Sequence, residues 1–281
     1  MGFLIMRPGT LFECLQATSD KSGIAISAPD RPDLDHAGLI DLCNNTVKSL
    51  NGFGIGRNDR VAIVLPNGPE MATAFVSVAC AATTAPLNPA YRQDEFRFYL
   101  DDLKSKALIV ETGSESPAVA AAKELGIPLI ELSTADGAAA GDFTLNAPDL
   151  SGTAASPGFA EADDIGLILH TSGTTSRPKI VPLSQRNLAA SAGNISATLN
   201  LEATDRCMNI MPLFHIHGLI AAVLSSLAAG GSTYCTPGFD ALRVFRWFED
   251  AAPSWYTAVP TMHQAIVARA ARNADTLAAM D

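Results

Sequence analysis

The sequence predicts an α/β fold in which parallel sheets are covered by helices. Short runs rich in β-branched residues alternate with segments whose apolar residues recur at helical spacing, and the alternation continues through both halves of the chain. The 281 residues are 48% hydrophobic and 17% charged, which is ordinary globular composition and sufficient for one large or two modest domains. No repeat of fixed short period relates the halves, so their likeness is one of architecture.

The first half of the chain contains three strand-like runs and three helix-period segments. The strands are expected at residues 60–66, 107–111 and 128–132, and the helices at residues 68–84, from Gln93 onward, and in an alanine-rich segment through Leu125. In the helix that begins at Gln93, one side carries Phe96, Tyr99, Leu100 and Leu103. Such a stripe is typical of a helix that covers a sheet.

Residues 133–161 interrupt this pattern. They are rich in Ala, Gly, Ser and Pro and lack apolar periodicity, so we expect a linker or a loosely held surface loop. This composition predicts a first α/β subdomain, with its linker, over residues 1–160. A second α/β subdomain is then expected over residues 161–281.

The second half resumes the alternation. Strands are expected at residues 164–172, 207–212, 232–236 and 255–259, and helices from Ser184 to about Leu199 and at residues 218–230, 240–251 and 261–273. Phe245, Trp247 and Phe248 have the spacing of a helix core face, so no cofactor role is expected for them. His36, on a charged loop, and His263, on a helix, are not expected at a site either.

Charge and cysteine usage exclude several classes of function. Lys and Arg number 19 against 29 Asp and Glu, a formal net charge of −10, and no basic run interleaves with aromatics, which argues against nucleic acid as a partner. The five cysteines lack C-x-x-C spacing, so neither a zinc site nor a disulfide framework is indicated. No apolar stretch approaches the roughly 18 residues of a membrane span. These features favour a soluble, cytoplasmic protein that does not enter a membrane.

The stretch HTSGTTSRPKIVPLSQRNL, residues 170–188, is a candidate phosphate-binding loop. It follows an expected strand and is expected to run into the helix at Ser184, where open α/β sheets bind ligands. It is not a Walker A loop, since no second glycine precedes Lys179. Hydroxyls, close backbone approach at Gly173 and the lysine charge suit a triphosphate with its magnesium ion. A solvated Ser/Thr-rich turn is the alternative, which the surrounding strand and helix disfavour.

Several stretches together resemble the ANL superfamily of adenylate-forming enzymes, which includes the acyl-CoA synthetases. Residues 169–188 resemble its phosphate-binding signature, and GIGRNDRVAIVLPNGPEM, APLNPAYRQDEFRFYL, MPLFHIHGL and WYTAVPTMHQ resemble further parts of the same family. Ser176, where most relatives have glycine, and the two histidines of MPLFHIHGL are similar to the oxalate–CoA ligase branch.

The resemblance implies a fold, a reaction and a set of site residues. The fold is that of the N-terminal domain of acyl-CoA synthetases, and the reaction converts a carboxylate, ATP and CoA to acyl-CoA, AMP and pyrophosphate, with Mg²⁺ accompanying ATP. The ATP phosphates are assigned to Thr171, Ser172, Gly173, Thr174, Thr175 and Lys179. A small acid such as oxalate is assigned to His215 and His217, which would supply N–H donors.

The two histidines have a second interpretation. In an extended segment they would point the same way, as a metal pair does, but no third ligand is evident nearby, so no metal site within the protein is expected. One of them could instead serve buried backbone groups.

The sequence also departs from the family. Ile180 replaces a glycine after the loop lysine, and Asp35-His36 replaces a Thr-Tyr pair. The adenine- and ribose-binding motifs, the hinge and the C-terminal domain with its lysine are not found. We therefore expect an incomplete second unit, no assignable catalytic residue and weak or no catalysis by this chain alone. Its apolar edge would be covered by a homodimer or by a partner that supplies the missing part. The alternative is an inactive remnant that binds a nucleotide or a partner.

Overall fold

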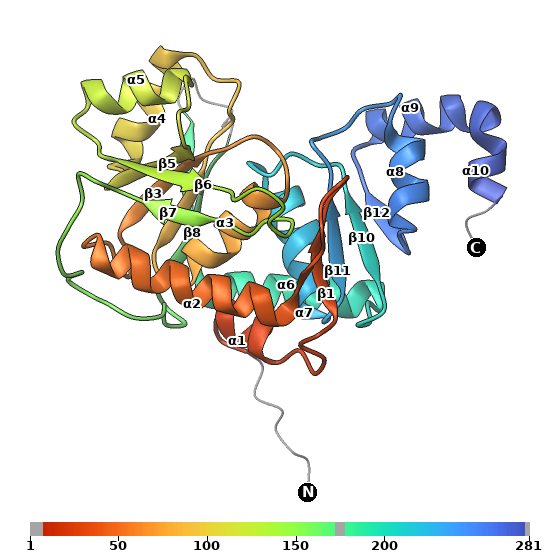
Figure 1. Cartoon of the computed structure of the whole chain (residues 1–281), viewed down its shortest axis with the longest axis horizontal. Helices are drawn as coiled ribbons and strands as arrows, with labels where there is room; N and C mark the ends of the chain where they lie inside the picture. The colour runs from red at the N-terminus through yellow and green to blue at the C-terminus, as the bar shows by residue number, and fades with distance from the viewer. Residues whose placement is uncertain (1–7, 172–177, 279–281) are drawn as a thin grey trace, which may run out of the picture.

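The computed structural model describes residues 8–171 and 178–278. They form two mainly parallel sheets that lie side by side and are flanked by helices (Figure 1). The pairs β1–β2, β6–β7 and β8–β9 are antiparallel, and the other strand pairs within these ranges are parallel. The predicted fold class is confirmed.

One sheet has seven strands and the other has five. In spatial order, the larger sheet contains β7 (Thr144–Asn146), β6 (Leu129–Ser133), β5 (Ala107–Glu111), β3 (Arg60–Val64), β4 (Thr83–Pro86), β8 (Ile165–Thr171) and β9 (Lys179–Ser184). The smaller sheet contains β12 (Trp255–Thr257), β10 (Arg206–Asn209), β11 (Ser232–Cys235), β1 (Ile24–Ser27) and β2 (Leu34–Asp35).

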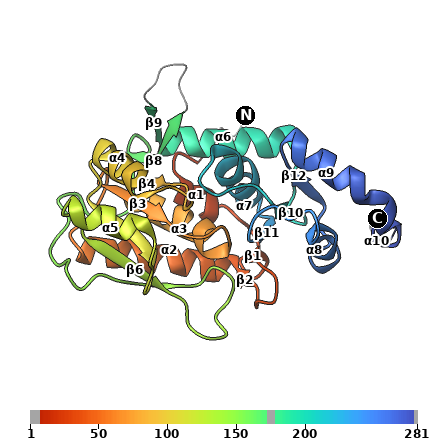
Figure 2. The same ribbon diagram turned by 90° about the horizontal axis from the view of Figure 1, so that it is seen from above.

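Helices cover both sheets (Figures 1 and 2). They are α1 (Leu11–Gln16), α2 (His36–Gly52), α3 (Pro69–Ala79), α4 (Gln93–Leu103), α5 (Pro117–Glu124), α6 (Gln185–Leu199), the π-helical η1 (His217–Leu224), α7 (Ser225–Ala228), α8 (Val244–Ala251), α9 (Pro260–Ala270), the 3₁₀ turn η2 (Ala271–Asn273) and α10 (Ala274–Ala278). None of these described helices is long and apolar enough to cross a membrane.

Helix α3 is the centre of the packing. It contacts β3 and β4 of the larger sheet and β11 of the smaller one. Its residues from Met71 to Ala79 are all buried, which removes the one-sided pattern of a surface helix. The largest of them, Phe75, is fully buried in the cluster of apolar side chains that spans both sheets.

The two sheets do not divide the chain at the expected boundary between residues 160 and 161. β1 comes from the first half of the chain and pairs with β11, so it belongs to the smaller sheet. β8 comes from the second half and pairs with β4 of the larger sheet. Two hydroxyls reinforce that exchange, because Thr83 Oγ1 donates to the Ile165 carbonyl at 2.6 Å and Thr84 Oγ1 to the Gly166 carbonyl at 2.8 Å.

The predicted linker at residues 133–161 is not loosely held. It contains β7, which pairs with β6, and Ala140 and Phe143 are buried in the core. Arg31 Nε and Nη2 donate to the carbonyls of Ala138 and Ala139 at 3.1 and 3.0 Å. The expectation from composition is wrong here, because long-range contacts order a segment that lacks local periodicity.

Some elements differ from the sequence prediction. The predicted helix over residues 68–84 ends at Ala79, and β4 occupies its last residues. The predicted helix over residues 218–230 is π-helical through Leu224 before α7 begins. His36 lies at the start of α2, capped by Asp35, and not on a charged loop: its ring is buried, and Nε2 lies 3.1 Å from the Gly230 carbonyl.

Candidate functional site

The candidate phosphate loop joins the two strands of a β-hairpin. β8 and β9 pair in antiparallel register, and Thr171 lies opposite Lys179 at the end of the hairpin next to the connecting loop. Both residues are exposed. Of the predicted phosphate-binding residues, these two lie within the described ranges, whereas Ser172, Gly173, Thr174 and Thr175 fall outside them.

The stretch does not run directly from loop to helix as expected. β9 intervenes, and α6 begins only at Gln185, where Ser184 caps it by accepting from the Asn187 amide at 3.2 Å. β9 is the edge strand of its sheet. Pro182, which has no backbone N–H to donate, is therefore tolerated there, as it would not be in a central strand. Ile180, the departure from the family glycine, lies opposite His170 in the hairpin.

The base of the hairpin is fixed by a network of charged and polar groups. The buried Asp164, just before β8, accepts from Arg57 Nε at 2.6 Å, from Asn58 Nδ2 at 2.7 Å and from the Glu161 amide at 2.7 Å. Burial acts to raise the pKa of Asp164, but the hydrogen bonds outweigh it and hold the pKa below its ordinary value of 3.8. Asn58 Oδ1 also accepts from the Ile165 amide at 2.8 Å.

Gln185 secures the hairpin to the helices beneath it. Its buried amide accepts from the Leu11 amide at 3.1 Å and donates to the Ala79 carbonyl at 2.6 Å. Gly166 makes room for it, since a Cβ at that position would lie 2.6 Å from Gln185 Nε2. The first turn of α6 and the first residues of β8 are therefore held together by close packing.

At the other end of β8, His170 packs against α4. Its Nε2 lies 3.2 Å from Asp102 Oδ2, and its ring meets Tyr99 edge to face at a centroid distance of 4.7 Å. Burial lowers the pKa of His170, and Asp102 opposes that shift without cancelling it. The imidazole therefore favours the neutral form at neutral pH.

The second candidate region, residues 210–217, follows β10 at the carboxyl end of the smaller sheet. Asn209 folds the chain back by accepting from the Met211 amide at 3.1 Å and donating to the Met211 carbonyl at 3.2 Å. Thr236 Oγ1, just past β11, donates to the Asn209 carbonyl at 2.9 Å. Gly218 permits the turn into η1, because a Cβ there would lie 2.5 Å from the Pro212 carbonyl oxygen.

His215 and His217 do not lie in an extended segment, so the condition under which they would point the same way, as a metal pair does, is not met. His215 lies in the turn, is exposed, and rests against Phe214 at a centroid distance of 4.5 Å. His217 begins η1, and its Nε2 shares a 2.6 Å hydrogen bond with Thr257 Oγ1. Partial burial lowers the pKa of His215.

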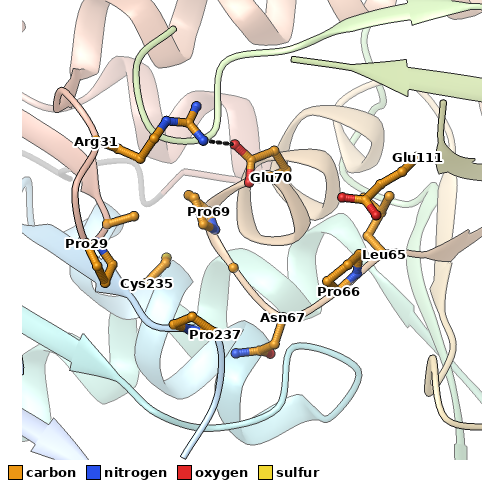
Figure 3. A pocket seen from close by; sticks show the side chains of 12 residues that line it. Pro29, Arg31, Leu65, Pro66, Asn67, Pro69, Glu70, Glu111, Cys235 and Pro237 are labelled. Carbon is orange, nitrogen blue, oxygen red and sulfur yellow. Dashed lines mark hydrogen bonds and ion pairs between the residues drawn. The ribbon is translucent and has the colours of Figure 1, made fainter. Parts of the chain in front are cut away.

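A cavity of about 280 Å³ lies between the two sheets, and the predicted site residues within the described ranges do not line it. Figure 3 shows Arg31, Glu70 and Glu111 around it, with the Arg31–Glu70 ion pair at 3.2 Å. Burial, and then the charge of Glu70, raise the pKa of Glu111. The walls come from the carboxyl ends of β1, β3, β5 and β11 and from the start of α3.

Asn67 lines this cavity (Figure 3) and was not among the predicted site residues. It belongs to the LPNGPEM stretch, which carries part of the family resemblance, but an asparagine before a helix ordinarily indicates only a turn or a cap. Its two hydrogen bonds reach the other sheet, so no sequence pattern could have revealed them.

The comparisons with known proteins decide the family. Residues 16–280 match the family described as AMP-binding enzyme. This chain belongs to that family. The resemblance to adenylate-forming enzymes is thereby confirmed.

Its relatives are CoA ligases. The chain is 42% identical over 258 residues to an oxalate–CoA ligase from Arabidopsis thaliana, covering 90% of this chain and 50% of that protein. It is 37% identical to an oxalate–CoA ligase from Saccharomyces cerevisiae, covering 73% and 42% of the two chains. The chain thus spans about half the length of the curated relatives it matches.

Solved structures of the family share the fold. The ATP-bound form of MatB from Rhodopseudomonas palustris superimposes with a TM-score of 0.77 at 26% identity, over 93% of this chain and 51% of that one. The apo form of the same protein gives a TM-score of 0.76.

Proposed function

We propose that this chain carries the phosphate-binding and carboxylate-binding part of an AMP-forming acid–CoA ligase, with oxalate or a similarly small acid as its substrate. The observation that carries the proposal is the β8–β9 hairpin, which brings the exposed Thr171 and Lys179 opposite each other at the mouth of the signature loop. The ligase relatives support the reaction class, and the oxalate–CoA ligases among them support the acid.

In the proposed reaction a carboxylate oxygen attacks the α-phosphorus of ATP. The bond from that phosphorus to the bridging oxygen breaks, pyrophosphate leaves, and an acyl-adenylate forms. The CoA thiol then attacks the acyl carbon and releases its proton to solvent, the bond from that carbon to the oxygen shared with phosphate breaks, and AMP departs with that oxygen. Lys179 and the loop hydroxyls Ser172, Thr174 and Thr175 would hold and orient the leaving pyrophosphate, where added positive charge and O–H donors favour departure.

Magnesium would enter with ATP. Among the described residues no group of three or more His, Cys, Asp or Glu side chains could hold a metal ion, so the phosphates would supply most of its ligands. When bound, the ion would offset phosphate charge. Among the described residues, Thr171 carries the hydroxyl nearest in sequence to the loop. It would be the candidate protein ligand of the magnesium ion.

His215 and His217 would bind the acid. An imidazole donates at least one N–H in either protonation state, which suits the oxygens of a small dicarboxylate. The lowered pKa of His215 keeps its ring neutral at neutral pH, and the bond to Thr257 orients the His217 ring. These residues bind and orient the substrate, and neither is assigned a covalent step.

Calorimetric titration with MgATP tests the proposal. We expect Lys179→Ala to weaken MgATP binding at least tenfold, because a charge-assisted contact to phosphate is lost. The control is Lys48→Ala, which removes an exposed lysine from α2 and should leave binding unchanged. Equal loss in both variants, or no binding by the unmutated chain, would count against the proposal.

A further inference from the structure

We propose that Asn67 is a positioning residue that fixes the histidine-bearing segment, residues 210–217, against the seven-stranded sheet. Its effect on substrate rests on the function proposed above, but its structural effect does not.

The amide of Asn67 joins three separate parts of the chain. It lies three residues after β3, at the carboxyl end of the larger sheet. Its Nδ2 donates to the Thr236 carbonyl at 3.0 Å, and its Oδ1 accepts from the Leu213 amide at 2.7 Å. Leu213 follows β10 and Thr236 follows β11, so both partners lie just past the carboxyl ends of strands of the smaller sheet. One side chain therefore ties the carboxyl ends of three strands together.

Only a side-chain amide fits this arrangement. The two partners are a backbone donor and a backbone acceptor, and Asn offers one acceptor and one donor group in a single plane. An aspartate would keep the bond to Leu213 but would place an anionic oxygen against the Thr236 carbonyl. A shorter or apolar side chain would leave both backbone groups without this partner in a half-buried position, which would weaken the link between the sheets.

The link continues toward the histidines. Thr236 Oγ1 donates to the Asn209 carbonyl, and Asn209 in turn holds both polar backbone groups of Met211. Leu213, which Asn67 holds, is buried and lies two residues before His215. Besides its contact with the Phe214 ring, His215 is positioned by the backbone around it, which Asn67 holds at Leu213 from the opposite sheet.

Imidazole NMR signals test the positioning directly. The chain has five histidines, so each signal is separable. In Asn67→Ala we expect the His215 and His217 signals to move while those of His170 and His263 stay in place. Asn45→Ala, which removes an exposed asparagine from α2, should move none of them. Unmoved His215 and His217 signals in Asn67→Ala would overturn the inference.

A second variant covers a failure to fold. Asn67→Asp preserves size and the acceptor for Leu213, so it should move the same two signals by a smaller amount. An unchanged spectrum in a folded Asn67→Asp would likewise overturn the inference.

Oxalate titration separates this inference from the proposed function. In the unmutated chain oxalate should move the His215 and His217 signals, and Asn67→Ala should weaken oxalate binding roughly tenfold while MgATP binding stays within about twofold. If oxalate moves neither signal in the unmutated chain, the proposed acid site fails, and the shifts caused by Asn67→Ala still decide the positioning role.

Discussion

The two candidate regions of the molecule are held in opposite ways. The β8–β9 hairpin is fixed at its base, where the buried side chains of Asp164 and Gln185 collect hydrogen bonds, and its turn end presents the exposed Thr171 and Lys179. The segment at residues 210–217 is held along its backbone, where Asn209 bonds Met211 and Asn67 bonds Leu213, and Thr236 bonds the Asn209 carbonyl just before it. Each region follows a strand that pairs in parallel with a neighbour, β8 in the larger sheet and β10 in the smaller one.

The difference matches what each region would have to bind. A triphosphate is large and highly charged, so an exposed lysine such as Lys179, at the turn end of the hairpin, suits it. A small acid offers few contacts, so its partners need fixed positions to distinguish it. Removing an anchor should therefore affect stability at the hairpin, and geometry at the histidine segment.

The largest expected effect on stability comes from Asp164→Ala. Arg57, Asn58 and the Glu161 amide would lose their shared acceptor, the buried Asp164 side chain, so we expect a loss of about 2–4 kcal/mol in the free energy of unfolding. Urea denaturation measures it. The matched control is Asp163→Ala, since that side chain is 89% exposed in its ion pair with Arg186 and should contribute at most about 0.5 kcal/mol. Equal losses in the two variants would contradict the assigned role of the base.

A somewhat smaller effect is expected at the histidine segment from Gly218→Ala. The added Cβ would lie 2.5 Å from the Pro212 carbonyl oxygen, so the turn must shift at a cost of about 1–3 kcal/mol. The same change at Gly193, in α6, meets no atom within 4 Å and should stabilise the chain by up to about 1 kcal/mol. Thermal unfolding distinguishes the two variants. An unchanged Tm in Gly218→Ala would contradict the close approach of the Gly218 and Pro212 backbones.

The smallest expected effect is a pH dependence at the hairpin base. The pKa of Asp164 is lower in the folded chain than its ordinary 3.8, so its stabilising contribution is complete above that value and is lost as pH falls below it. The stability difference between the unmutated chain and Asp164→Asn should therefore shrink between pH 5 and pH 2. Urea midpoints across this range measure it, and a constant difference would show that Asp164 does not titrate as described.

Much of the fold follows from local sequence, and its exceptions have physical causes. Segments with strong period, such as α4 and β5, lie where predicted. β4 was missed because Thr83 and Thr84 continue an apolar run, and their strand conformation depends on pairing with β3 and β8. The division at residue 160 misled for the same reason, since β1 and β8 each pair with strands from the other half of the chain.

The candidate site divides similarly. The candidate phosphate loop is a contiguous stretch, so it could be proposed from sequence, although β9, which follows it, was not predicted. The histidines were found as a motif, but their arrangement was not, because Gly218 and Asn209 fold the segment into a turn. Asn67 acts only through residues 146 and 169 positions away, so its contribution is visible only in three dimensions.

The most direct test of the central claim is phosphorus NMR of MgATP in the presence of the chain. Contact between the β8–β9 hairpin and the phosphates predicts that the β- and γ-phosphorus signals shift or broaden with the unmutated chain and with Lys48→Ala, and return toward free MgATP with Lys179→Ala. Equal perturbation by Lys179→Ala and the unmutated chain, or no perturbation by either, would contradict a phosphate-binding role for this hairpin.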